Sequence, residues 1–135
     1  MRKIEHKKPD PVPVVSWTWD EGRYWDLWMF VHVGSGVLIA VFAHLIGLSP
    51  AVAYAGTLIG MILWECGEVA FGIREEWTNL VLDVVFGMAG FALVYEFVAP
   101  LLGTRWNVAI FIAIAIALAL FEILGWKAYR KRATK

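Results

Sequence analysis

Four long apolar stretches restrict the fold of this chain more than any other feature of its sequence. They run over residues 26–47, 51–72, 77–102 and 106–129, and a transmembrane helix needs about 20 mostly apolar residues. Hydrophobic residues make up 60% of the 135 positions and charged residues 18%, which is more apolar surface than a water-soluble domain of this size buries. A single segment in lipid must pair its own backbone polar groups, so each stretch is predicted to be a helix. The sequence therefore predicts an all-α, integral membrane four-helix bundle.

The basic residues predict how this bundle is oriented. Residues 1–25 form a cytoplasmic and interfacial segment, 26–129 the transmembrane domain, and 130–135 a basic tail. Helices of alternating direction place both chain ends and Arg74, in the loop after the second span, on one side of the membrane. Of the 12 lysines and arginines only Arg105 would lie on the other side. Because basic residues favour the cytoplasmic side, we predict that the N and C termini are both cytoplasmic.

Charge and hydropathy also suggest the partners. The formal net charge is +0 and the basic residues are accounted for by membrane orientation, so no nucleic acid partner is expected. We expect a multi-pass protein of a cell membrane, a prokaryotic plasma membrane, in contact with membrane lipid. A second copy of the chain or another membrane protein remains open as a partner.

Several ionisable side chains lie inside the predicted spans, where each costs roughly 2.5 kcal/mol or more on insertion scales. At a rise of ~1.5 Å per residue from the span ends, all fall within roughly 5–11 Å of the cytoplasmic boundary. Four helices thus contribute a polar group at one level, and one amide joins them. The residues are His32, Glu65, Glu68, Asp83, Glu122 and the neutral Asn79.

The spacing of these residues predicts a shared, inward-facing pocket. Glu65 and Glu68 are three residues apart and Asn79 and Asp83 four apart, so each pair shares one helix face. Glycines at similar spacing let a neighbouring helix approach closely. They are predicted to do so in the first span (Gly36), the second (Gly56 and Gly60) and the third (Gly87 and Gly90).

The acids need a balancing charge. Four carboxylates exceed Arg74, the only fixed cation in the adjoining loop, so either several carboxyls are protonated or a cation joins them. A divalent metal, a proton in transit and a charged ligand all remain open. Clusters of carboxylates with one imidazole suit magnesium, manganese, calcium or zinc. The candidate metal ligands are Glu65, Glu68 and Asp83, and the further candidate binding residues are Glu68, Arg74, Asn79 and Glu122.

A pattern of spaced polar residues and glycines extends from Asp26 to Glu96. It comprises Asp26, His32, Glu65, Glu68, Arg74, Asn79, Asp83, Gly87 and Gly90. In these residues the chain resembles the VanZ-like membrane protein families, although Asn79 and Asp83 stand in the reverse of the usual order. The resemblance implies a membrane protein with its site at these positions. The best-known family member is linked to glycopeptide antibiotic resistance.

Three functions stay open at this level. In the first, the site binds a lipid headgroup, an amphiphile or a cation; in an enzyme, Glu65 or Asp83 would be the base and His32 its partner. In the second, the chain is a small proton- or cation-coupled transporter. In the third, the acids only hold helices together in a structural or accessory subunit. A lipid kinase is disfavoured, because the sequence has no lysine-bearing polar helix and no nucleotide motif.

Overall fold

The computed structural model describes residues 13–19, 22–70 and 76–133. The four long helices are α1 (Trp28–Leu45), α2 (Pro50–Ala70), α3 (Trp77–Leu93) and α4 (Thr104–Ala133). By length and composition all four can cross a membrane, with the third span extended to Leu101 by further helical turns. The predicted all-α fold, with four helices long and apolar enough to be membrane spans, is therefore confirmed. Arg74 lies outside the described residues.

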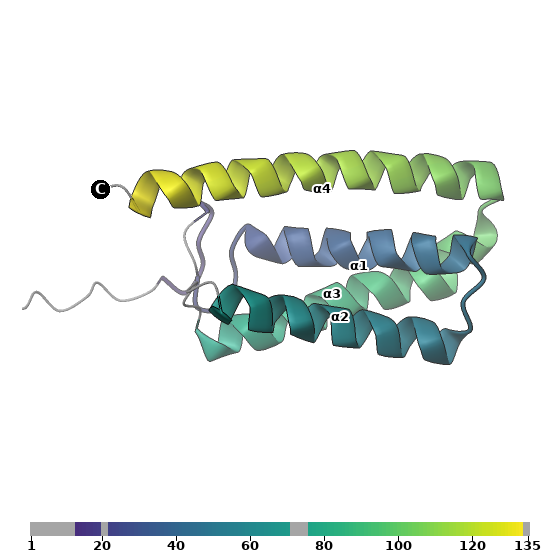
Figure 1. Ribbon diagram of the computed structural model, residues 1–135, viewed down its shortest axis with the longest axis horizontal. Coiled ribbons are helices and arrows are strands. Elements are labelled where there is room, and N and C mark those ends of the chain that lie inside the picture. The colour runs from purple at the N-terminus through teal and green to yellow at the C-terminus, as the bar shows by residue number, and fades with distance from the viewer. Residues whose placement is uncertain (1–12, 20–21, 71–75, 134–135) are drawn as a thin grey trace, which may run out of the picture.

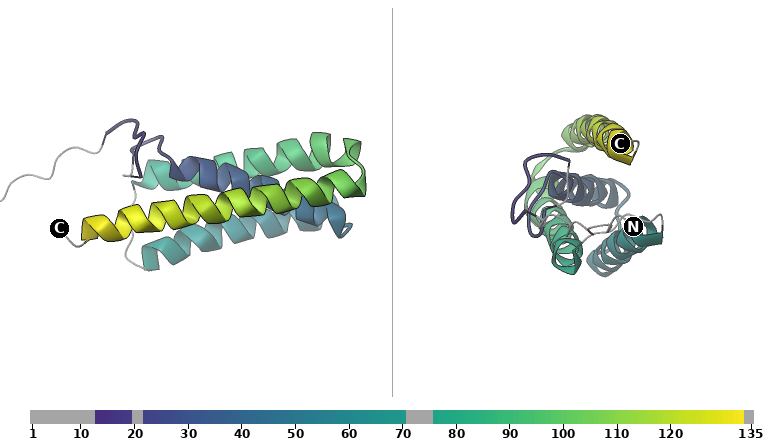
Figure 2. Two further views of the ribbon diagram at one scale, coloured as in Figure 1. Left: turned by 90° about the horizontal axis from the view of Figure 1, so that it is seen from above. Right: turned by 90° about the vertical axis from the view of Figure 1, so that its left-hand side faces the viewer.

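Helix α1 lies at the centre of the bundle (Figure 1). Its most extensive contacts are with α3 and then with α4, and α2 packs against both α1 and α3. Viewed from the end, α4 and α2 lie on different sides of α1 (Figure 2), and they make no extensive contact with each other. Only 6% of the spanning part of α4 is buried. Most of the surface of α4 is therefore available to lipid.

A glycine ends α1 and turns the chain towards α2. Gly47 has a φ of 69°, in the left-handed region that glycine adopts without a steric penalty. The N–H groups of Gly47 and Leu48 donate to the carbonyl oxygens of His44 and Ala43, at 3.1 and 3.0 Å. This pair of hydrogen bonds is the Schellman arrangement, which satisfies the last carbonyls of a helix.

The link between the third and fourth helices is irregular because it contains Pro100. A π-helical turn, η1 (Val94–Val98), and a 3-10 turn, η2 (Ala99–Leu101), follow α3. Proline has no N–H to donate to the carbonyl four residues earlier, so the regular α-helix cannot continue through it. The buried amide of Asn107 donates to two carbonyl oxygens of this link at 3.0 and 3.1 Å. These bonds fix the start of α4.

Glycines allow α1 and α3 to cross closely, as predicted. A Cβ atom on Gly36 would overlap the backbone of Gly87, and one on Gly90 would meet the backbone of α1 at 2.7 Å. The prediction was wrong for α2, because no atom of the described residues lies within 4 Å of a Cβ built on Gly56 or Gly60. These two glycines face open space, since α2 turns a different face to the bundle.

That face of α2 is a narrow stripe with a spacing of four residues. Its buried members are Ala53, Thr57, Met61 and Glu65. The first end of the stripe meets an apolar core that includes Ala40, Phe91 and Tyr95. The other end places Glu65 among buried polar residues. The bundle therefore has an apolar half, towards Gly47, and a polar half, towards the chain ends.

Candidate metal site

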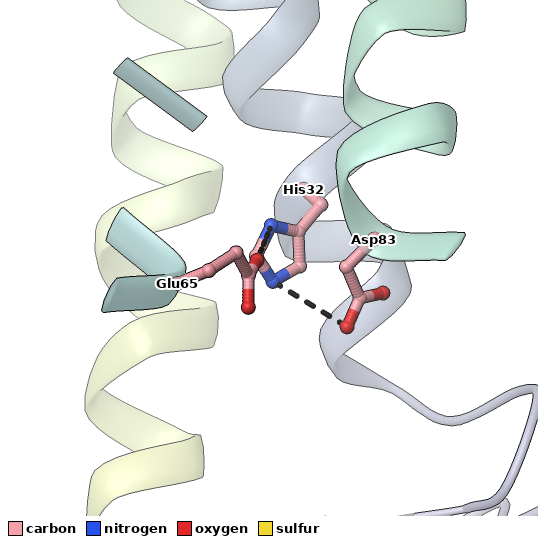
Figure 3. Close-up of side chains that lie close together, drawn as sticks. All are labelled: His32, Glu65 and Asp83. Carbon is pink, nitrogen blue, oxygen red and sulfur yellow. Dashed lines mark ion pairs between the residues drawn. The ribbon is translucent and has the colours of Figure 1, made fainter. Parts of the chain in front are cut away.

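Three buried ionisable side chains from three helices meet in the polar half of the bundle (Figure 3). His32 comes from α1, Glu65 from α2 and Asp83 from α3, and they are 4%, 2% and 1% exposed. His32 Nδ1 lies 3.5 Å from Glu65 Oε1, and His32 Nε2 lies 3.8 Å from Asp83 Oδ2. One ligand atom from each residue can be chosen so that all three lie within 4.8 Å of one another. Measured along the helix axis, each of the three residues lies roughly 6–9 Å from the nearest end of its own helix.

A glycine one turn after Asp83 lets the three helices converge. A Cβ on Gly87 would lie 2.9 Å from the methyl carbon of Met61 and 3.3 Å from the backbone oxygen of His32. Met61 is itself one turn before Glu65 on the buried stripe of α2. A larger residue at position 87 would require the end of the flexible Met61 side chain to move and the backbone of α1 to shift slightly. The absence of a side chain at Gly87 therefore contributes to the close approach of the three helices.

The Glu65 carboxylate has no hydrogen-bond donor within the part of the chain that the structure describes. Neither of its oxygens accepts a hydrogen bond from any described residue, and only 2% of the residue is exposed. Its 3.5 Å separation from His32 Nδ1 is longer than the 2.7–2.9 Å, roughly, of a charge-assisted hydrogen bond. An uncompensated buried carboxylate is strongly unfavourable. Glu65 therefore needs a proton or a cation beside it.

The three side chains fit a divalent metal ion. They offer one imidazole nitrogen and two carboxylates; the imidazole suits zinc and the carboxylates suit zinc and manganese, whereas magnesium prefers oxygen ligands alone. Donors around a tetrahedral ion bound at about 2.1 Å lie about 3.4 Å apart, so ligand atoms that all lie within 4.8 Å of one another would have to close by up to about 1.4 Å to share one ion. Two carboxylates also balance the charge of one divalent ion. Three protein ligands leave further coordination positions open.

A third buried acid, Asp26, is joined to this cluster through Asn79. The Asn79 amide nitrogen donates to Asp83 Oδ2 and to Asp26 Oδ2, each at 3.2 Å. Asp26 is fully buried, and its other oxygen accepts the N–H groups of Trp28 and Met29 at 2.9 and 3.4 Å. Asp26 thus caps the first turn of α1 and fixes Asn79 at the same time.

Asp26 belongs to the residue pattern that resembles the VanZ-like families, but it is not among the predicted catalytic, binding or metal-ligating residues. An aspartate just before an apolar helix is an ordinary capping residue, and that signal concealed its second contact. Its partner Asn79 is 53 residues away, so only the packing of α1 on α3 reveals the pair.

The remaining predicted site residues lie around the cluster or outside the described part. Glu68 is partly exposed on α2, one turn from Glu65, and does not belong to the three-residue group. Glu122 lies on α4 and faces the same pocket as His32. Arg74 lies outside the described residues. The structure thus brings together His32, Glu65 and Asp83, with Asn79 beside them.

Two lateral grooves reach the cluster from opposite sides of α2. The first, of about 350 Å³, lies between α1, α2 and α4 and is lined by His32, Glu122 and Gly60 among others. The second, of about 600 Å³, lies between α2 and α3, and among the described residues that line it only Glu65 and Cys66 are neither apolar nor aromatic. Trp77, in the lining of the second, is 73% exposed. The grooves therefore open sideways, where a bilayer would place lipid.

Comparisons of this chain with protein-family models, with curated proteins and with solved structures found no match. The resemblance to the VanZ-like families therefore stays a prediction from the residue pattern.

Proposed function

We propose that this protein binds a divalent cation inside the membrane through His32, Glu65 and Asp83, and that the cation binds the headgroup of a membrane lipid. The observation that carries the proposal is the Glu65 carboxylate, which is 2% exposed and accepts no hydrogen bond from a described residue. A cation between the three side chains would supply the missing partner. The same cation would fasten α2, whose buried surface is otherwise small, to α1 and α3.

The position of the cluster supports a lipid ligand. Both grooves that reach it open towards the side of the bundle, so a ligand would arrive from the bilayer. The site also resembles in composition the one expected for VanZ-like proteins, in which an acid from each of two spans accompanies a histidine. A binding role is sufficient to account for these features, and the proposal includes no chemical step.

Metal binding to the purified protein tests this proposal. Metal-free protein in detergent is titrated with Mn²⁺ and followed by calorimetry and electron paramagnetic resonance. We expect one Mn²⁺ per chain, with a magnetic coupling to imidazole nitrogen that disappears in His32→Gln. Because Glu65 would be a direct ligand, Glu65→Gln is expected to weaken binding by about 100-fold or more.

A matched control is available at the opposite end of the bundle. Glu96 is exposed and accepts a hydrogen bond from Tyr54 at 3.1 Å, so Glu96→Gln makes the same chemical change far from the cluster. This variant is expected to bind Mn²⁺ like the original chain. Equal Mn²⁺ affinity in Glu65→Gln and Glu96→Gln, or no binding by the original chain, would contradict the proposal.

One observation favours proton transfer as a second candidate function. The two nitrogens of His32 face carboxylates on two different helices, at 3.5 and 3.8 Å. An imidazole between two carboxylates can pass a proton from one to the other by exchanging which nitrogen carries it. In that case flux in reconstituted vesicles would follow a pH gradient and stop in Glu65→Gln, and no Mn²⁺ would bind.

A further inference from the structure

The larger groove combines a long apolar wall with a single acid. It encloses about 600 Å³ between α2 and α3, and Val81 and Val84 are among its apolar lining. Glu65 lines the same groove, so one side chain belongs both to the groove and to the cluster. Trp77, at the first position of α3, is 73% exposed, and an indole ring suits the headgroup layer. This distribution of apolar and charged surface matches an amphiphile.

The open coordination positions of the proposed cation indicate which kind of headgroup would bind to it. Magnesium and manganese sites commonly combine one or two protein carboxylates with phosphate oxygens of the ligand. Glu65 lies five residues, roughly 8 Å, from the end of α2, and the headgroup layer of a bilayer is about 5–8 Å thick on each side. A phospholipid phosphate is the oxygen donor that a bilayer presents closest to this level.

The charges near the groove are compatible with an anionic headgroup. Once a divalent ion balances Glu65 and Asp83, these acids no longer repel a phosphate. The exposed Arg23 lies near the mouth of the groove, because its backbone oxygen accepts a hydrogen bond from the side chain of Thr78 at 2.9 Å, next to Trp77. Basic side chains near a phosphate strengthen binding.

We propose that a phospholipid with an anionic phosphate headgroup binds from the side of the bundle. One acyl chain occupies the groove between α2 and α3, and a phosphate oxygen binds the cation held by His32, Glu65 and Asp83. This inference rests on the proposed function, and it adds the class of lipid and the groove through which the lipid reaches the metal.

Photocrosslinking in detergent tests this inference. The probe is phosphatidic acid with a diazirine in one acyl chain, added to the full-length protein in maltoside micelles, whose detergent carries no phosphate. With Mn²⁺ present, we expect adducts on α2 and α3 around Cys66, Val81 and Val84. Chelation of Mn²⁺, or use of a diacylglycerol with the same photoreactive chain, is expected to reduce these adducts by about tenfold, since the bond to the metal is then lost.

A pair of variants separates the groove from the rest of the lipid-facing surface. Val81 lines the groove and is 40% exposed, whereas Val108 on α4 is 42% exposed and lies in neither groove. Val81→Trp fills the groove and is expected to lower the adduct yield by about tenfold, while Val108→Trp leaves it unchanged. Both variants are expected to keep the Mn²⁺ affinity of the original chain.

The possible failures can be told apart. Adducts of equal yield on the outer face of α4, adducts concentrated in the groove beside Glu122, or yields independent of Mn²⁺ would overturn the lipid inference while Mn²⁺ still binds. Absence of Mn²⁺ binding by the original chain would overturn the proposed function itself. Because the wild-type adduct map is informative alone, the test does not depend on the folding of any variant.

Discussion

At the scale of single residues, Asn79 connects the candidate site to the start of α1. Its one amide group carries two hydrogens, and it lies 3.2 Å from an oxygen of Asp26 and 3.2 Å from an oxygen of Asp83. Asp26 is itself tied to the first turn of α1, where it accepts the N–H groups of Trp28 and Met29, four and three residues before His32. Asn79 therefore holds the Asp83 carboxylate at a fixed position relative to His32. In the proposed metal site it is a positioning residue and not a ligand.

This role predicts the behaviour of Asn79→Leu, which keeps the approximate size of the side chain but removes the amide. Loss of a residue that orients a metal ligand weakens metal binding by about 10–100-fold without removing the site. We expect the Mn²⁺ affinity to fall within this range, with one ion per chain retained, as measured by calorimetry.

Asn107→Leu is the matched control for this variant. Asn107 is also buried and its amide also donates two hydrogen bonds, but at the opposite end of the bundle. Its replacement is expected to reduce stability and leave Mn²⁺ affinity unchanged. Equal losses of affinity in both variants would mean that Asn79 acts only through the stability of the fold.

The same residues show what a sequence reveals about such a site. His32, Glu65 and Asp83 could be singled out because ionisable residues inside apolar spans are costly and therefore few. Their similar depth below the predicted cytoplasmic boundary followed from the number of residues between each of them and the end of its span. Their mutual contacts could not be predicted, because distances of 3.5 and 3.8 Å depend on how each helix is rotated about its axis. Glu68 and Glu65 share a helix face in sequence terms, yet only Glu65 reaches the cluster.

At the scale of helices, the glycines of α1 and α3 determine how closely the two helices pack. Small residues occur at similar spacing in α1, α2 and α3, so the sequence predicts close packing for all three. A stripe of small residues permits close approach but does not specify which neighbour is approached. In α2 the residues that face the bundle are those of the buried stripe from Ala53 to Glu65, and the glycines do not. Gly60 instead lines a lateral groove.

This difference predicts opposite results for two identical substitutions. Gly36→Ala places a methyl group against the backbone of Gly87, which cannot move without shifting α3, so we expect the free energy of unfolding to fall by about 1–3 kcal/mol. Gly56→Ala meets no atom within 4 Å and is expected to cause no loss. Unfolding by sodium dodecyl sulfate, followed by circular dichroism, measures both. Equal stability of the two variants would contradict the close crossing of α1 and α3.

At the scale of the whole molecule, the bundle is asymmetric along its axis and around it. The polar cluster occupies the half that is nearest to the chain ends, and the apolar core occupies the other half. Around the axis, α4 covers α1 but does not close against α2, which leaves a groove on each side of α2. A ligand that arrives from lipid can therefore reach the cluster from only one of the two membrane leaflets.

The leaflet follows from the charge distribution. An even number of spans places both chain ends on one side, and the segment before α1 and the end of α4 lie at the same end of the bundle (Figure 1). Eleven of the 12 basic residues belong to that side by sequence, and Arg105 alone to the other. Because lysines and arginines near span ends are retained on the cytoplasmic side, we predict cytoplasmic termini and a lipid site that opens to the inner leaflet.

Reporter fusions after Lys135 and within the α1–α2 turn test this orientation. A fluorescent protein that folds only in the cytoplasm is expected to be bright after Lys135, while alkaline phosphatase, active only outside, is expected to work after Leu48. Replacement of the four basic residues within the last seven residues of α4 by glutamine (Lys127, Arg130, Lys131 and Arg132) removes a third of the 12 basic charges and is expected to increase the inverted fraction, because the remaining bias is smaller. Phosphatase activity after Lys135 in the unaltered chain would place the site in the outer leaflet. In that case the proposed metal site would be unaffected, but the lipid that binds it would have to come from the outer leaflet.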